Sequence, residues 1–458
     1  MGRLFGTDGI RGIAGSELTA ECGYKLGLAV AEVLTEERGA KPRILIGKDT
    51  RHSGDMFEAA IAAGLCAMGS DVTLLGVVPT PAVAFLVRAL DADAGIMISA
   101  SHNPSEYNGL KVFSGEGYKL SDALEEKIEA IILGEIEVKP VSGEKIGCVA
   151  FDENAAILYE QHVISVLKGA KRPFSTGRRI LFDLSNGSAT RTAPKIFTKA
   201  NLDAFSCDFI ANDPDGFNIN RDCGSTHIDR LAELVVTGGY SMGIAFDGDA
   251  DRCLAVDEKG NLIDGDMIIA AIALEMKRKG TLHQDTAVVT KLSNLGFHIF
   301  AEEHGIRVAV TDVGDRYVLE EMLRSGANIG GEQSGHIIMT DYATTGDGEV
   351  TATVMLSLLA SAPEKSASEV FGAMKSLPQV SRNVHVENAM KKAVMEDPGV
   401  LSKRDAIAET LGGKGRILLR PSGTEALIRI MLEGEDISQI RAMAEELADM
   451  IEAICGQH

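Results

Sequence analysis

The chain has 458 residues, about three times the usual length of one domain, so we expect three or four compact cores. Apolar residues make up 45% of the chain and charged residues 24%, a globular balance that excludes intrinsic disorder. The formal net charge of -21 argues against nucleic acid or an anionic membrane as a general partner. An anionic small substrate stays open, because a few arginines in a cleft can override the overall field.

The N-terminal residues 1–6 lack the apolar region of a secretory signal and form no myristoylation motif. The longest apolar stretches, such as 74–87, are shorter than the roughly 18 residues of a membrane-spanning helix. The seven cysteines form no CxxC pair, and their odd number predicts neither a disulfide framework nor a zinc site. We therefore expect a cytoplasmic protein with reduced thiols and no membrane segment.

Predicted helices and strands alternate through most of the chain. The first block has a helix, a strand, a helix and two strands, at 18–34, 43–46, 56–68, 72–75 and 95–98. The second has a strand, a helix, a strand, a helix and a strand, at 179–184, 192–200, 204–210, 228–236 and 242–246. The third repeats the alternation through the segments 267–277, 286–289, 295–304, 307–310 and 318–325. This alternation predicts right-handed βαβ crossovers and three similar α/β units with mostly parallel sheets.

The C-terminal part has a different pattern. A linker containing Ser, Ala and Pro is expected near 360–368, followed by strands at 416–419 and 427–432 and a helix at 437–454. Two strands joined by a short turn and backed by a helix predict an α+β module rather than a fourth parallel unit.

Ser101 lies in a polar turn, residues 99–104, directly after the apolar strand predicted at 95–98. Open α/β sheets place their ligands at such strand ends. Ser, Asn and Pro also build ordinary turns, so this turn alone does not indicate a site.

Asp247, Asp249 and Asp251 follow the strand predicted at 242–246, and a spacing of two places their carboxylates on one side of an extended chain. Three adjacent carboxylates repel one another unless a cation such as Mg²⁺ lies among them. An EF-hand is excluded, because Arg252 stands at loop position six instead of Gly. Two alternatives stay open: a solvated acidic turn, and an aspartyl-phosphate phosphatase with Asp247 as nucleophile, whose usual Thr or Val at the fifth position is Asp251 here.

The turn at 420–425 is rich in small hydroxyl residues and glycine, and arginines stand on both sides of it. Backbone N–H groups of such a turn can converge on a phosphate, and the guanidinium groups add charged donors. The residues concerned are Arg420, Ser422, Gly423, Thr424 and Arg429.

A glycine-flanked loop at 330–336 offers the side chains of Glu332, Ser334 and His336. Such polar groups suit a hydroxyl-rich ligand, whose discrimination depends on pairing each hydroxyl group. The chain contains neither GxxxxGK[ST] nor GxGxxG after a strand, so ATP and a nicotinamide cofactor are unsupported. Phosphate would have to come from the substrate or from the enzyme itself.

Together, the segment GTDGIRG at 6–12, the Ser101 turn, the Asp247 loop and the 420–425 turn resemble the α-D-phosphohexomutase superfamily, in the same order along the chain. The resemblance implies three related mixed-sheet α/β domains plus a smaller C-terminal α+β domain around a central cleft. The implied domains are 1–152 with the Ser101 turn, 153–255 with the Asp247 loop, 256–367 with the 330–336 loop and 368–458 with the 420–425 turn.

The resemblance also implies roles for single residues. Ser101 matches the phosphoserine of the superfamily, and its phosphate would join Asp247, Asp249 and Asp251 as ligands of one Mg²⁺. Near the reacting groups, Arg11 and His102 would lie beside Ser101, Arg252 would neutralise the transferring phosphate, and Lys111 and His336 are acid–base or electrostatic candidates. Glu332 and Ser334 match sugar-hydroxyl ligands, and the non-reacting phosphate would be bound by Arg420, Ser422, Gly423, Thr424 and Arg429.

The segments 5–12, 313–318 and 330–336 resemble the branch of the superfamily that acts on glucosamine phosphates. The implied reaction is the reversible conversion of glucosamine 6-phosphate to glucosamine 1-phosphate, through a 1,6-bisphosphate, on the route to cell-wall amino sugars. The alternatives are a phosphomannomutase/phosphoglucomutase and a non-catalytic phosphosugar-binding protein, and a homodimer is compatible with each. Ala250 and Ala426 replace a Gly and a Pro, and Asp312 stands where this branch often has Lys, so no cationic role is expected there.

Overall fold

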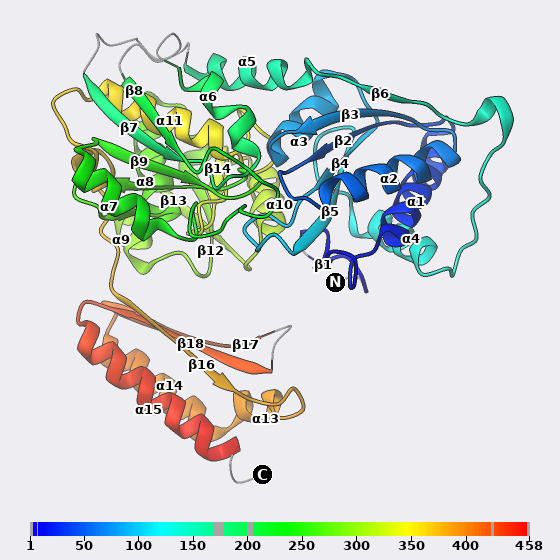
Figure 1. Ribbon diagram of the computed structural model, residues 1–458. Helices are drawn as coiled ribbons and strands as arrows, with labels where there is room; N and C mark the ends of the chain where they lie inside the picture. The colour runs from blue at the N-terminus through cyan, green and yellow to red at the C-terminus, as the bar shows by residue number, and fades with distance from the viewer. Residues whose placement is uncertain (1–2, 7, 168–176, 199–204, 423–425, 456–458) are drawn as a thin grey trace. The chain divides into compact units, whose positions relative to one another are not determined.

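The computed structural model describes residues 3–6, 8–167, 177–198, 205–422 and 426–455. The chain divides into two compact units (Figure 1). Unit 1 comprises Met1–Leu292 and Gly305–Ala373, and unit 2 comprises Ser293–His304 and Met374–His458. Among the described residues, no helix is long and apolar enough to cross a membrane.

Unit 1 contains three sheets, each with its own helices. The first is built from β1 (Ile10–Ile13), β2 (Arg43–Lys48), β3 (Asp71–Val77), β4 (Ala94–Ile98), β5 (Tyr107–Ser114) and β6 (Val149–Phe151), with α1 (Ala20–Arg38), α2 (Gly54–Ala67), α3 (Thr80–Ala89) and α4 (Asp122–Ile132). The second is built from β7 (Arg178–Asp183), β8 (Phe205–Ile210), β9 (Met242–Phe246), β10 (Cys253–Asp257) and β11 (Leu262–Ile263), with α5 (Ala155–Leu167), α6 (Ala193–Ile196) and α7 (Ile228–Gly238). The third is built from β12 (Thr286–Thr290), β13 (Arg307–Thr311), β14 (Ile329–Gly331) and β15 (Ile337–Met339), with α8 (Gly265–Lys279), α10 (Asp315–Ser325), α11 (Gly348–Ser361) and α12 (Ala367–Phe371).

The three sheets repeat one strand order. Four neighbouring strands run β3-β2-β4-β5 in the first sheet, β8-β7-β9-β10 in the second and β13-β12-β14-β15 in the third. In each, the first three strands are parallel and the fourth is antiparallel to the third. This repetition confirms the predicted triplication and the mixed-sheet fold class. The three loops that enter the antiparallel strand, at 99–106, 247–252 and 332–336, are therefore topologically equivalent.

The first sheet shows how the sequence pattern builds these layers. Alternate residues of β2, such as Ile44 and Ile46, belong to the core with α1, α2 and α4. A β-carbon at Gly47, on the other face, would meet Val83 of α3, so α3 covers the opposite face. Helices α1 and α2 pack closely because their glycines face each other: a β-carbon at Gly64 would lie 2.2 Å from the carbonyl oxygen of Tyr24.

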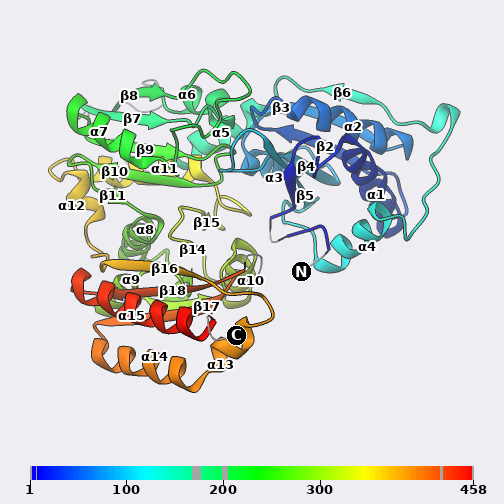
Figure 2. The ribbon, with the colours of Figure 1, turned by 60° about the horizontal axis from the view of Figure 1, so that its bottom comes forward.

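Unit 2 is the predicted α+β module, with more elements than expected. It contains β16 (Gln379–His385), β17 (Gly415–Pro421) and β18 (Leu427–Gly434), with α9 (Leu295–Glu303), α13 (Lys391–Glu396), α14 (Pro398–Leu411) and α15 (Ile437–Cys455). The strands form an antiparallel sheet of order β16-β18-β17. Figure 2 shows α14 and α15 beside this sheet, and their apolar side chains share one core with the strands.

Two predicted elements differ from the structure. The helix expected at 192–200 is shorter, because α6 ends at Ile196 and the ring of Phe197 turns inward to stack on Phe182, with ring centroids 4.5 Å apart. The linker expected near 360–368 is partly helical: α11 extends to Ser361, and α12 starts after Ser366, whose side chain forms a capping box with Glu369. The seven cysteines are unpaired.

Candidate active site

Ser101 lies at the first of the three equivalent loops, directly after the fully buried strand β4. The residue is buried and has a left-handed backbone conformation, with φ of +52°, which is uncommon for a non-glycine residue. Its Oγ donates a hydrogen bond of 2.5 Å to Oδ2 of Asp247, which belongs to the second loop. The Nδ1 atom of His102 is 3.3 Å from the same Oγ. The predicted proximity of these three side chains is present in the structure.

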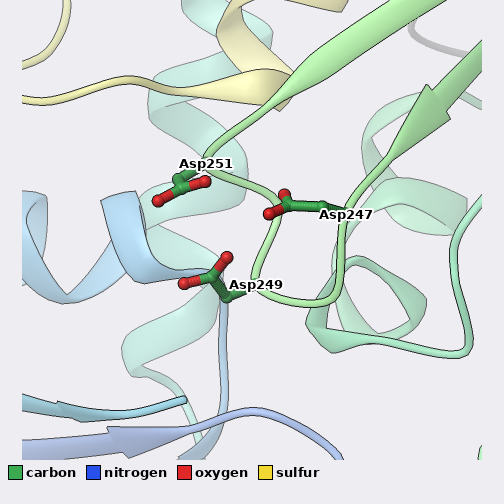
Figure 3. A group of neighbouring side chains, drawn as sticks. All are labelled: Asp247, Asp249 and Asp251. Atoms are coloured by element: carbon green, nitrogen blue, oxygen red, sulfur yellow. The ribbon is translucent and has the colours of Figure 1, made fainter. Parts of the chain in front are cut away.

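The second loop brings Asp247, Asp249 and Asp251 together, with one carboxylate oxygen of each within 4.8 Å of the others. Figure 3 shows the three carboxylates pointing toward one another. They converge through a turn and not, as the sequence spacing suggested, along an extended chain: Ala250 has a φ of +56° and its N–H donates to the carbonyl oxygen of Asp247. Ala250 thus adopts a conformation that glycine reaches more easily.

The electrostatics of this loop suit a divalent cation. Burial and the nearby charges of Asp251 and Asp249 raise the pKa of Asp247 well above its usual range. Within the described residues, Oδ1 of Asp249 and Oδ1 of Asp251 are buried without a hydrogen-bond partner. Three buried, mutually repelling carboxylates with unused oxygens fit a small hard cation such as Mg²⁺.

Lys111, on β5, is buried among three carboxylates. Its Nζ lies 2.9 Å from Asp249 Oδ2, 3.0 Å from Asp8 Oδ2 and 3.4 Å from Asp251 Oδ2. Burial lowers the pKa of Lys111, but the carboxylates outweigh burial and raise it above its usual range. Lys111 is therefore a fixed positive charge beside the aspartate loop.

Two arginines and a histidine complete the surroundings of Ser101. The backbone N–H of Arg252 donates to Asp247 Oδ1 at 3.2 Å, and its Nε is 4.0 Å from Asp251 Oδ1. Arg11, on β1, forms an ion pair with Asp8. Burial, followed by the charges of Arg252 and Arg11, lowers the pKa of His102 to about 4.

The third loop holds the predicted sugar ligands. Glu332 accepts a hydrogen bond from the N–H of Gly314 at 3.0 Å, and Ser334 is exposed. His336 has Nδ1 at 3.7 Å from Asp251 Oδ2, and its Nε2 lies 3.1 Å from the backbone nitrogen of Gly346. Burial lowers the pKa of His336, but the carboxylates of Asp251, Asp315 and Glu332 together outweigh burial and raise it to about 9.

Unit 2 carries the residues predicted to bind a second phosphate. Arg420 of β17 and Arg429 of β18 are directly paired across the two strands. Burial and the charge of Arg429 lower the pKa of Arg420. Ser422 is buried, and its carbonyl oxygen accepts a hydrogen bond from Lys391 Nζ at 2.6 Å. Like charges on facing residues fit an anion site, and the predicted ligands Gly423 and Thr424 lie outside the described residues.

Several residues of the site were missed in the sequence. Thr80, at the start of α3, donates from Oγ1 to Asp249 Oδ2 at 2.6 Å. Asp315 lies 2.6 Å from Lys119 Nζ and 3.6 Å from His336 Nε2. Asp49 and Arg51 follow β2 as Ser101 follows β4. Polar residues at the end of a predicted strand could therefore have indicated that these two belong to the site. Asp312, which stands where the branch often has Lys, is exposed, and its Oδ1 lies 2.6 Å from Lys291 Nζ.

Four family models match the chain, all described as phosphoglucomutase/phosphomannomutase: α/β/α domain I at residues 2–139, domain II at 159–260, domain III at 264–377 and the C-terminal domain at 382–450. The fold also resembles that of a phosphoglucomutase/phosphomannomutase family protein from Burkholderia thailandensis, with 22% identity and a TM-score of 0.78 over 99% of this chain and 98% of that chain. N-acetylphosphoglucosamine mutase from Aspergillus fumigatus, solved with GlcNAc-6P and magnesium, has 17% identity and a TM-score of 0.69, over 99% of this chain and 96% of that one. Fold and domain matches thus define a phosphohexomutase.

Sequence similarity to a relative of known name identifies the branch of this class. The phosphoglucosamine mutase of Acetivibrio thermocellus is 50% identical over 457 residues, which cover 100% of both chains. The chain belongs to the phosphoglucosamine mutase family. This result confirms the branch that the segments 5–12, 313–318 and 330–336 indicated.

Proposed function

We propose that this protein interconverts glucosamine 6-phosphate and glucosamine 1-phosphate, with Ser101 as the phosphoryl carrier. The observation that carries the proposal is the 2.5 Å hydrogen bond from Ser101 Oγ to Asp247, which joins the candidate nucleophile to the buried aspartate triad. The relationship to phosphoglucosamine mutase over the whole chain supports the choice of substrate.

The reaction consists of two phosphoryl transfers. In the first, O1 of glucosamine 6-phosphate attacks the phosphorus of phosphorylated Ser101; the bond from phosphorus to Oγ breaks, and the O1 proton leaves to a base. The product is glucosamine 1,6-bisphosphate. After the bisphosphate reorients, Ser101 Oγ attacks the 6-phosphate; the bond from phosphorus to O6 breaks, the base returns the proton to O6, glucosamine 1-phosphate leaves and the phosphoserine is restored.

Asp247, Asp249 and Asp251 would hold one Mg²⁺, with an oxygen of the Ser101 phosphate as a further ligand. A bound Mg²⁺ supplies positive charge that stabilises a transferring phosphoryl group. Lys111 supplies a second, fixed positive charge at the same carboxylates, 2.9 Å from Asp249 Oδ2. Phosphoryl transfer depends mainly on such positioning and electrostatics, so the buried charges of this loop suit it.

The other predicted residues have supporting roles in the proposal. Arg252, Arg11 and His102 surround the Ser101 phosphate, and Lys111 and His336 are the acid–base or electrostatic candidates. Glu332 and Ser334 bind sugar hydroxyl groups. The phosphate that is not transferred is bound in unit 2 by Arg420, Ser422, Gly423, Thr424 and Arg429. We further propose a cytoplasmic location, and a homodimer stays an untested prediction.

A comparison of substrates tests the proposal. With Mg²⁺ present, kcat/KM should be highest for glucosamine 1-phosphate among the 1-phosphates of glucosamine, glucose and mannose. A preference for mannose 1-phosphate would refute the choice of sugar and favour a phosphomannomutase. A protein that binds all three tightly without turnover would instead be a phosphosugar-binding protein.

The phosphatase alternative is tested by the chemistry of the phosphoenzyme. A phosphoserine survives hydroxylamine, whereas an acyl phosphate on Asp247 is cleaved by it. Radiolabel transferred from glucose 1,6-bisphosphate should therefore withstand hydroxylamine and be absent from the Ser101→Ala variant. Label that is lost to hydroxylamine would assign the nucleophile to a carboxylate.

A further inference from the structure

The loop that carries Ser101 closes around the side chain of Arg51. This guanidinium donates from Nη2 to the carbonyl oxygens of Ser101 and Asn103, at 2.9 and 2.8 Å. From Nη1 it donates to the carbonyl oxygens of Pro104 and Tyr107. Three backbone carbonyls of this loop, and that of Tyr107 at the start of β5, thus face a single side chain, although about 50 residues separate Arg51 from Ser101 along the chain.

The remaining donor of the guanidinium is also used. Nε donates to Asp49 Oδ2 at 2.9 Å, so all five N–H groups have acceptors. The side chains of Arg51 and Asp49 are completely buried and form an ion pair. Because Asp49 balances its charge, and the Nη donors point to carbonyl oxygens, Arg51 acts on the backbone of the loop rather than on the Ser101 hydroxyl.

Two further side chains hold the backbone of Ser101. Asn220 donates from Nδ2 to the carbonyl oxygens of Ser101 and Asn103, at 2.8 and 3.1 Å. These are the two carbonyls that Arg51 Nη2 also binds, so each receives two donors. On the other side, the N–H of Ser101 donates to Ser99 Oγ at 2.9 Å, and Ser99 Oγ donates to Asp49 at 2.6 Å.

These contacts surround the strained residue of the loop. A non-glycine residue with a φ of +52° persists only where its surroundings hold it, and such residues cluster at functional sites. We propose that Arg51, together with Asn220, is a positioning residue of the mutase: it holds Ser101 in the left-handed conformation that presents Oγ to the aspartate triad. The inference rests on the proposed role of Ser101 as phosphoryl carrier.

The test compares variants in steady-state turnover and in a single phosphoryl transfer. The full-length protein is phosphorylated with labelled glucose 1,6-bisphosphate, and transfer of the label to glucosamine 6-phosphate is followed by rapid quench. Arg51→Ala should lower both kcat and the transfer rate by about 100-fold, since a displacement of about 1 Å has that effect. KM for glucosamine 1-phosphate should change less than about threefold, because Arg51 does not bind the substrate.

Arg178 provides a matched control. It also binds backbone carbonyl oxygens, those of Leu359 at the end of α11 and of Ala362, Pro363 and Lys365 after it, but none of these belongs to the Ser101 loop. Arg178→Ala should lower thermal stability without changing kcat. If Arg51→Ala slowed transfer no more than Arg178→Ala, or raised KM with kcat unchanged, the inference would be wrong.

Two more variants separate geometry from charge and guard against misfolding. Arg51→Lys keeps the charge but cannot span five acceptors, so it should stay at least about 30-fold slow; a wild-type rate would show that charge, not positioning, matters. If Arg51→Ala does not fold, Asn220→Ala removes two of the same carbonyl bonds and should slow transfer about tenfold, and no slowing would overturn the inference.

The wild-type protein keeps the two proposals distinguishable. Failure of the wild type to take label from glucose 1,6-bisphosphate onto Ser101 would refute the proposed function itself. If the wild type is labelled and active, and the Arg51 and Asn220 variants transfer the label as fast as the wild type, only the positioning role would be refuted.

Discussion

Glu129 anchors the N-terminal segment that leads to Asp8 and Arg11. Replacing Glu129 with glutamine tests how much this carboxylate stabilises the segment. The carboxylate is buried on α4 and accepts three backbone N–H groups. Oε1 accepts those of Leu4 and Phe5, both at 2.7 Å, and Oε2 accepts that of Arg3 at 2.9 Å. In Glu129→Gln, one oxygen becomes an NH₂ group that faces an N–H donor.

The expected loss follows from these three bonds. A hydrogen bond to a charged group contributes about 1.5–3 kcal/mol, and a neutral one about 1 kcal/mol. Glu129→Gln loses one bond and weakens two, so the anchor should lose at least about 2.5 kcal/mol. Amide hydrogen exchange of the N-terminal peptide measures this local opening, and its protection should fall by about 30-fold or more.

Glu135→Gln is the control. Glu135 binds the side chain of the same Arg3, but both groups are about half exposed, so its loss should leave the protection of the N-terminal peptide nearly unchanged. Equal protection of the N-terminal peptide in Glu129→Gln and Glu135→Gln would refute the reasoning.

The anchor should also depend on pH. Burial raises the pKa of Glu129, but the N–H groups of Phe5, Leu4 and Arg3 outweigh it and hold the pKa below its usual range. The stabilisation is therefore complete above about pH 4.5 and is lost as the pH falls through the lowered pKa. Wild-type protection should decrease in that acidic range, whereas Glu129→Gln should show no such step.

Three other predictions concern the site. Asp247→Asn should weaken Mg²⁺ binding by about 100-fold in calorimetric titration, and unchanged binding would place the metal elsewhere. Lys111→Met leaves carboxylates without their cation and should destabilise unit 1 by about 3–5 kcal/mol in chemical denaturation; an unchanged midpoint would contradict the buried charge network. Arg429→Ala should raise KM for glucosamine 1-phosphate by about 10–100-fold with kcat nearly constant, and a loss confined to kcat would exclude a binding role.

The sequence predicted the parts of the fold that carry a strong apolar pattern. Strands β4 and β9 are wholly buried runs that end in polar turns, so both the strands and the ligand-bearing loops after them were recognisable. Helix α3 was missed because Pro79 and Pro81 interrupt its start, although proline is compatible with the first turn of a helix. Strand β16 was missed because most of its residues are exposed and polar.

The site was predictable only where its residues are neighbours in the chain or match a motif. Asp247, Asp249 and Asp251 share one loop, so their grouping could be predicted from the sequence, although they converge through a turn and not along an extended chain. For Arg51 the sequence offered only its place at the polar end of a strand, and for Glu129 it offered no signal, because each acts on backbone groups of a segment far away in the sequence. Every residue has backbone N–H or carbonyl groups, so a side chain that binds them does not require particular residue types in the partner segment. Such a contact therefore produces no recognisable sequence pattern.

The identity of the phosphorylated residue tests the account most directly. After incubation with glucose 1,6-bisphosphate and Mg²⁺, peptide mapping by tandem mass spectrometry should place one phosphoryl group on Ser101. The same enzyme should then transfer that group to glucosamine 6-phosphate. A phosphoryl group on Asp247 or on any other residue, or turnover that persists in Ser101→Ala, would contradict the account.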